Sequence, residues 1–196
     1  PDLVLPLAPS GSDRIYYRLQ TANQSAIGTY SPNDAESLAF LSFSRHFKSL
    51  ELPVPTIRAE NLSAKVYLQE DLGATTLYSY LLQKEDYFPD YLVQIYKRVV
   101  EQIARMQIQG GKELDYSRCY PKSRFDKQSM FWDFNYFKYH FLLPSQVSYQ
   151  EAALEQDFHA LADFLLEADD NYFMFRDFQS RNIMIKAGEP YFIDYQ

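Results

Sequence analysis

Three oxygen-bearing side chains in the last quarter of the sequence have types and spacing that could do chemistry: Asp177, Asn182 and Asp194. Apolar strands are predicted at 183–185 and 191–193, because Gly and Pro in the short segment between them indicate a hairpin. Pairing of the strands would bring Asn182 and Asp194 to the same end of the hairpin. An amide and a carboxylate without His or Cys suit a hard cation such as Mg²⁺ better than zinc. Asp177, one loop away, would then orient a hydroxyl group.

The order of acid, amide, strand, turn, strand and acid resembles the catalytic loop and metal-binding strand of protein-kinase-like phosphotransferases. The loop reads Phe-Arg-Asp-Phe-Gln-Ser-Arg-Asn at 175–182, and the strand ends with Ile-Asp-Tyr-Gln at 193–196. More narrowly, the segment resembles the aminoglycoside phosphotransferase and choline kinase family, and within it the bacterial amino-sugar kinases, which carry a similar Arg-Asp-Phe core. Without the strands and the second acid around it, an Asp followed five residues later by an Asn would indicate only an ordinary turn, where both residues are common.

The resemblance implies an α+β, bilobal protein-kinase-like fold. Residues 1–72 would form the N-terminal nucleotide-binding lobe, a small antiparallel sheet with one helix. Residues 73–196 would form a mainly helical C-terminal lobe, and a hinge at about 69–73 would join the two. In kinase-like proteins further helices follow the acid of the last strand. We therefore expect the C-terminal lobe to be truncated at Gln196, with further sequence, and possible further domains, beyond it.

The activity that the resemblance implies is transfer of the γ-phosphoryl group of ATP to a hydroxyl of a small molecule, with a sugar or amino sugar as the expected acceptor. Asp177 would accept or orient the hydroxyl proton, while Asn182 and Asp194 would hold Mg²⁺ against the phosphates. Arg176 or Arg181 could add a cation near the loop, or could instead fix a neighbouring segment.

The turn between the first two predicted strands contains Ser10, Gly11 and Ser12, and it resembles the phosphate loop of the family. Backbone N–H groups in such a loop can surround phosphates, and Gly11 allows their close approach. An ordinary hairpin loop is the alternative. Arg14 and Arg18 follow the loop and are candidate cations for nucleotide phosphates.

The third predicted strand departs from the family pattern. Kinases place a Lys at the end of a Val-Ala-Ile-Lys-like strand, where it contacts the phosphates and pairs with a Glu of the next helix. Here the segment Ser-Ala-Ile-Gly puts Gly28 at that position. Glu36, in the first turn of a helix predicted at 33–47, would be the usual partner, or else simply an acid favourable at a helix N-terminus. Either an Arg takes over the role of the Lys, or nucleotide binding is altered.

Alternating residues predict two more strands, at 56–60 and 65–70, before the chain turns helical after Gly73. This change resembles the hinge of kinases, whose backbone pairs with adenine. Gln69, Glu70 and Leu72 are therefore expected to contact the nucleotide, and they are assigned by position because backbone contacts require no particular side chain.

Helical spacing predicts four helices after Gly73, over residues 76–82, 91–109, 125–143 and 151–167. In the aromatic third helix, Met130, Phe134, Phe137 and Phe141 share one face and are expected in the core. Trp132 and its neighbour Asp133 fall elsewhere around that helix, so they could bind a sugar or pack as ordinary side chains.

The composition sets broad limits. The sequence has 196 residues, 46% of them apolar, a net charge of −7 and a pI near 5.0. It is therefore expected to be globular, and an acidic surface argues against nucleic acid as a generic partner. The single Cys119 cannot form an intramolecular disulfide, and no segment resembles a signal peptide or a membrane span. A cytoplasmic protein without a membrane partner is expected.

Two other functions stay open. One is a catalytically weak, kinase-like regulatory domain that binds a nucleotide without turnover. It would be compatible with a Gly, Gly28, at the position of the kinase Lys. Retention of Asp177, Asn182 and Asp194 argues against it, because a pure binding module does not require all three. A protein kinase is the third option, although no Asp-Phe-Gly motif is present.

Overall fold

The computed structural model describes residues 1–8, 13–82 and 88–195 of the chain. These divide into two compact units. The first contains residues 1–121 together with 175–196, and the second contains residues 122–174. The expected boundary between the kinase lobes, at residues 72 and 73, falls inside the first unit and remains a prediction.

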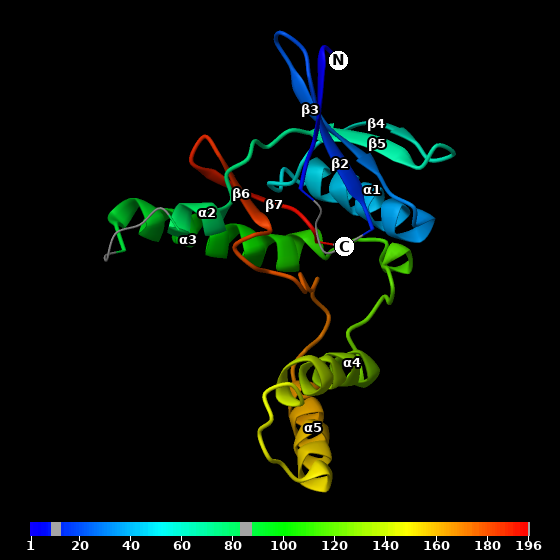
Figure 1. The fold of residues 1–196 in the computed structure, drawn as a ribbon, viewed down its shortest axis with the longest axis vertical. Coiled ribbons are helices and arrows are strands. Elements are labelled where there is room, and N and C mark those ends of the chain that lie inside the picture. The colour runs from blue at the N-terminus through cyan, green and yellow to red at the C-terminus, as the bar shows by residue number, and fades with distance from the viewer. Residues whose placement is uncertain (9–12, 83–87, 196) are drawn as a thin grey trace. The chain divides into compact units, whose positions relative to one another are not determined.

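The first unit begins with a five-stranded antiparallel sheet (Figure 1). In chain order its strands are β1 (Leu3–Pro6), β2 (Ile15–Gln20), β3 (Ser25–Tyr30), β4 (Ile57–Asn61) and β5 (Val66–Glu70). Their order across the sheet is β1-β2-β3-β5-β4, so that β3 and β5 pair although helix α1 separates them in the sequence. The strand nearest the predicted hinge thus lies beside the strand in which a kinase carries its Lys.

Helix α1 (Asp34–Ser49) packs against one face of this sheet. Its N-cap is Asn33, whose side-chain oxygen accepts hydrogen bonds from the backbone N–H groups of Ala35 and Glu36. The ring of Phe40 lies 5.3 Å from that of Tyr67 on β5, which identifies the face of the sheet that the helix covers. This cap fixes where the helix begins and therefore where Glu36 lies.

The rest of the first unit is helical apart from one hairpin. It contains α2 (Leu77–Leu82), α3 (Asp90–Arg105), a π-helical turn (Met106–Gly110), a 3₁₀ turn (Tyr116–Arg118), and the strands β6 (Ile183–Lys186) and β7 (Glu189–Phe192). Ala187 and Gly188 connect the two strands and have φ angles of 52° and 81°. Two consecutive positive φ angles are typical of tight hairpin turns. The predicted hairpin is present, with a tighter turn than expected.

The second unit contains α4 (Lys127–Phe137), a π-helical turn (Lys138–Leu142) and α5 (Glu151–Leu165). The rings of Phe134 and Phe158 stack with their centroids 4.9 Å apart and join the two helices. Within the described residues, no helix combines the length and the apolar character that crossing a membrane requires.

Candidate active site

The β6–β7 hairpin brings Asn182 and Asp194 together. The strands pair with Ile183 opposite Phe192, and just beyond them the N–H of Ile193 donates to the carbonyl of Asn182 at 3.0 Å. This leaves the Nδ2 atom of Asn182 3.4 Å from an oxygen of Asp194. The side chains therefore meet where the predicted strand pairing required.

Asp177 lies in the loop that leads into this hairpin. Its backbone carbonyl accepts hydrogen bonds from Nδ2 of Asn182 at 3.0 Å and from the N–H of Gln179 at 2.8 Å. The loop is also held to α2, because the guanidinium of Arg181 lies 4.2 Å from the ring centroid of Tyr78. Since backbone atoms make the first two contacts, the loop is held in place while the carboxylate of Asp177 stays exposed to solvent.

Asn182 and Asp194 have the donor chemistry that a magnesium ion prefers. Nδ2 of Asn182 points to Asp177 and Asp194, so its Oδ1 is the atom that can coordinate a cation. Oxygen donors from an amide and a carboxylate fit Mg²⁺. Among the residues that the structure describes, no three His, Cys, Asp or Glu side chains gather into a denser metal site.

Tyr195 anchors the chain directly after Asp194. Its hydroxyl lies 2.6 Å from Oγ of Ser44 on α1, and Ser44 in turn donates its hydrogen to the carbonyl of Phe40. The Tyr195 hydroxyl must therefore be the donor to Ser44. Burial raises the pKa of this hydroxyl, so it keeps its proton. The ring also packs edge-on against Phe47 and Phe175, and Tyr195 is 2% exposed.

This anchor affects the geometry of Asp194, which has a φ angle of 63°. A residue other than Gly adopts this left-handed conformation only where its surroundings hold it there. The hydrogen bond of Ile193 holds the chain on one side, and the buried Tyr195 holds it on the other. The candidate metal residue is thereby connected to α1, the helix that carries Glu36.

The hydrogen bond between Tyr195 and Ser44 predicts different losses of stability when one or the other hydroxyl is removed. Ser44→Ala leaves the buried Tyr195 hydroxyl without an acceptor and should lower the free energy of unfolding by about 1–3 kcal/mol. Tyr195→Phe leaves Ser44 bonded to Phe40 and should cost only about 0.5–1.5 kcal/mol. Urea unfolding of both variants measures the difference; a larger loss for Tyr195→Phe would contradict the assigned donor.

The predicted hinge is held by two cations from different parts of the first unit. Arg18 of β2 donates to both carboxylate oxygens of Asp71, at 2.8 and 3.1 Å, and to the carbonyl of Gly73 at 2.8 Å. Lys186 of the hairpin lies 2.6 Å from the carboxylate of Glu70. Arg18 is thus bound at the hinge, and its assignment as a candidate for the nucleotide phosphates does not fit this position.

The two hinge acids are ionised more easily than usual. Burial alone would raise the pKa of Asp71, but hydrogen bonds from the Gly73 N–H and the Arg18 guanidinium outweigh it and lower the pKa. The pKa of Glu70 is also lowered, because hydrogen bonds from Lys186 and Thr56 outweigh the effect of its burial. The pairing of Arg18 with Asp71 and of Lys186 with Glu70 was not identified from the sequence, since no local pattern links residues so far apart.

The other predicted hinge residues are largely buried. The side-chain oxygen of Gln69 is buried and makes no hydrogen bond with the described part of the chain. Leu72 is 6% exposed. Ser10, Gly11 and Ser12, the predicted phosphate loop, lie outside the described residues.

The expectation that Gly28 occupies the position of the kinase Lys is wrong. A Cβ atom at Gly28 would contact the side chains of Leu19 and Leu68, at 3.2 and 3.5 Å. Tyr67 is next to Leu68 on β5 and packs against α1, so Leu68 and Gly28 belong to the opposite face of the sheet. A Lys that pairs with a Glu of α1 must point the other way, from the face that carries Thr29.

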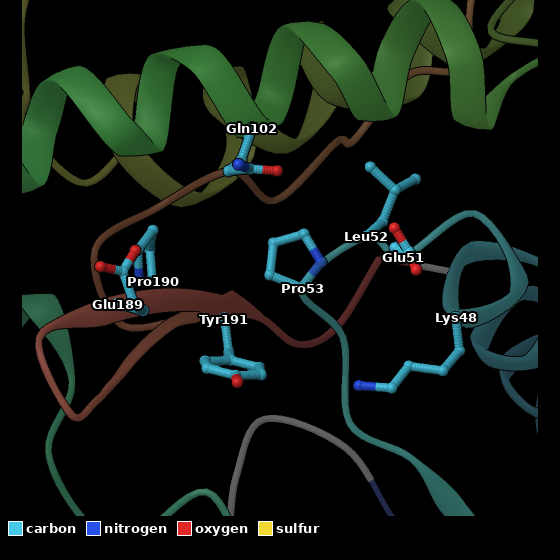
Figure 2. Close-up of a pocket in the computed structure, with 8 residues that line it drawn as sticks. All are labelled: Lys48, Glu51, Leu52, Pro53, Gln102, Glu189, Pro190 and Tyr191. Atoms are coloured by element: carbon cyan, nitrogen blue, oxygen red, sulfur yellow. The ribbon is translucent and has the colours of Figure 1, made fainter.

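A separate hollow of about 430 Å³ lies between the end of α1, the following linker, α3 and β7 (Figure 2). Pro53 lies between Pro190 and Leu52, and the charged side chains of Lys48 and Glu189 are at the edges. None of the three candidate catalytic residues lines it. The hollow is therefore distinct from the candidate active site.

An antiparallel sheet with one helix, a hinge, and a catalytic-type loop followed by a hairpin define a protein-kinase-like fold. The model of the phosphotransferase enzyme family matches residues 4–196. The chain belongs to this family.

Solved structures support the fold. The aminoglycoside phosphotransferase APH(4)-Ia superposes with a TM-score of 0.62 at 15% identity, over 98% of this chain and 65% of its own. The choline kinase LicA from Streptococcus pneumoniae gives 0.60 at 13% identity, over 97% of this chain and 63% of its own. A putative aminoglycoside phosphotransferase from Ralstonia eutropha gives 0.58 at 15% identity, over 98% and 59%. The chain thus spans somewhat less than two thirds of the length of these relatives. No curated protein matches it.

Proposed function

We propose that this protein transfers the γ-phosphoryl group of ATP to a hydroxyl group of a small molecule. The observation that carries the proposal is the arrangement of Asp177, Asn182 and Asp194 around one hairpin, in a chain of the phosphotransferase family. The amide of Asn182 contacts both acids, through the backbone of one and the carboxylate of the other. An Asp that orients the acceptor hydroxyl and an Asn and Asp that hold the metal are the residue types used in kinases, which supports the proposal.

In the proposed reaction, the carboxylate of Asp177 orients the acceptor hydroxyl and accepts its proton. The acceptor oxygen attacks the γ-phosphorus, the bond to the bridging oxygen breaks, and ADP leaves. An exposed Asp is a weak base, so its main contribution is to position the hydroxyl. Asn182 and Asp194 would hold Mg²⁺, which supplies charge stabilisation at the phosphate oxygens when it is bound.

The nucleotide is proposed to lie between the α1 face of the sheet and the hinge. The backbone of Glu70 and Leu72 would contact adenine, and the buried side-chain oxygen of Gln69 offers an acceptor nearby. Ser10, Gly11 and Ser12 would surround the phosphates. Structures of APH(4)-Ia variants with ADP or AMP-PNP support nucleotide use in this fold.

A sugar or amino sugar is the proposed acceptor. The APH(4)-Ia complexes also contain hygromycin B, and the other relative is a choline kinase, so both types act on small molecules. Trp132, on α4, is about half exposed and lies 5.2 Å from the ammonium group of Lys122. An exposed indole ring can stack on a sugar, and this role for Trp132 and Asp133 remains a prediction.

An acceptor screen tests the proposal. Full-length protein is incubated with labelled ATP and Mg²⁺, and separately with amino sugars, aminoglycosides, choline and a generic protein. We expect transfer to a sugar or amino sugar and none to the protein. Nucleotide binding without transfer to any acceptor would favour the regulatory domain, and transfer to the protein alone would indicate a protein kinase.

A further inference from the structure

The cation that replaces the missing kinase Lys can be located from the register of the sheet. Residues directly opposite each other on paired strands share a face. Thr29 of β3 lies opposite Tyr16 on β2 and opposite Tyr67 on β5, and Tyr67 packs on α1. Thr29 is therefore in the row that faces the helix, and it is 2% exposed. A short hydroxyl side chain here cannot reach both Glu36 and a phosphate.

Arg14 occupies the space next to this row. It directly precedes β2, and its contacts with α1 place its side chain on the face of the sheet that the helix covers. Its Nη2 atom lies 2.9 Å from the carboxylate of Glu36, and its guanidinium is 5.5 Å from the ring centroid of Phe40 on α1. Arg14 thus makes the contact with the helix acid that a Lys on β3 makes in kinases.

The guanidinium remains charged although Arg14 is only 5% exposed. Burial by itself would lower its pKa, but Tyr67, Tyr16 and Glu36 outweigh this and raise the pKa. A guanidinium has five N–H donors in a fixed planar arrangement, and Arg14 interacts with Tyr16 as well as with Glu36. Such a group can hold Glu36 and bind a phosphate oxygen at the same time.

Arg18 does not compete for this role. It lies opposite Ile27 and Gln69, in the next row towards the hinge, and its guanidinium is bound to Asp71 and Gly73. The two arginines are on the same face of the chain and four residues apart, yet one contacts α1 and the other contacts the hinge.

We propose that Arg14, held by Glu36, is the residue that binds the α- and β-phosphates of the nucleotide in place of the Lys that kinases carry on β3. The proposal rests on the proposed use of ATP. It assigns the phosphate contact to the residue just before β2 instead of to β3, and explains why Glu36 is paired although β3 has no Lys.

The test compares ADP with adenosine, which lacks the phosphates, by titration calorimetry on the full-length protein. Arg14→Gln should weaken ADP binding by about tenfold to a hundredfold, the loss expected for a charged hydrogen bond. Its affinity for adenosine should stay within about twofold of the wild type. Arg18→Gln is the matched control and should change ADP and adenosine binding by the same factor, because Arg18 acts at the hinge.

Two further variants keep the test decisive. Arg14→Gln leaves Glu36 without its partner, so Arg14→Gln with Glu36→Gln provides a charge-neutral form, for which the same selective loss of ADP is expected. Adding Thr29→Lys to Arg14→Gln should restore part of the ADP affinity. The inference is overturned if the Arg14 variants keep wild-type ADP binding, or lose ADP and adenosine equally. Wild-type protein that binds neither ligand would overturn the proposed function as well.

Discussion

Replacing Asp177 with Asn is expected to slow phosphate transfer by about a hundredfold to ten-thousandfold, the usual contribution of a catalytic acid or base. An amide cannot accept the proton of the acceptor hydroxyl. The fold of the loop should not change, because Asn182 and Gln179 bond to the backbone carbonyl of Asp177 and not to its carboxylate. Nucleotide affinity should therefore stay near that of the wild type.

Single-turnover transfer and nucleotide titration on the same preparation measure both effects. Asp157→Asn, which removes an exposed carboxylate from α5, is the matched control and should leave both values unchanged. Undiminished turnover in Asp177→Asn would rule out the assigned role, whereas loss of nucleotide binding would indicate that the loop itself had been disturbed.

The second large effect is expected at Asp194. Asp194→Asn retains an oxygen but removes the negative charge next to Asn182, so the site should bind Mg²⁺ more weakly. We expect transfer to fall about a hundredfold or more at a fixed low Mg²⁺ concentration, and to recover partly as Mg²⁺ is raised. Nucleotide binding measured without metal should be unaffected.

Transfer rates over a range of Mg²⁺ concentrations provide the measurement. Tyr195→Phe is a useful comparison because it changes the neighbouring residue without removing a charge, and it should shift the Mg²⁺ requirement much less. If Asp194→Asn had the Mg²⁺ dependence of the wild type, the metal would have to be held elsewhere.

The order of strands and helices could be predicted because periodicity and turn residues are local signals. The approach of Asn182 to Asp194 followed from one hairpin with Gly in its turn. The sequence could equally place the start of α1, since Asn33 is a preferred N-cap residue. These features depend on neighbours in the sequence.

The sequence did not show reliably which residues of β3 point towards α1. Side chains alternate along a strand, so an alignment shifted by one residue changes the face completely. Gly28 follows Ser-Ala-Ile and so aligns with the Lys of the Val-Ala-Ile-Lys pattern, but Thr29 is the residue on the face that α1 covers. Only the pairing with Tyr67, which lies far away in the sequence, shows this.

The contacts that hold the candidate site are also distant in the sequence. Ser44 and Tyr195 are 151 residues apart, and Arg18 and Asp71 are 53 apart. Each of these residues by itself is compatible with an ordinary surface or core position. Their association depends on packing of α1, the sheet and the hairpin, which periodicity does not report.

The predicted core face of the aromatic helix is wrong in part, for a different reason. Met130 is buried as expected, but Phe137 and Phe141 are exposed, at 44% and 63%. The α-helical spacing ends at Phe137, and a π-helical turn begins at Lys138. The wider turn changes which side chains after Phe137 face α5, so that Phe141 is exposed while Lys138 is buried against Glu151; the exposure of Phe137, inside α4, is not explained by it. A sequence pattern based on 3.6 residues per turn cannot anticipate this change.

The most direct test of the central claim is transfer of the labelled γ-phosphoryl group from ATP to a small-molecule hydroxyl by the full-length protein, with and without a magnesium chelator. We predict a phosphorylated sugar or amino sugar, formed with one ADP per product, that disappears with the chelator and forms about a hundredfold or more slowly in Asp177→Asn. Transfer at an undiminished rate in Asp177→Asn, or the absence of any phosphorylated acceptor despite measurable ATP binding, would contradict the account.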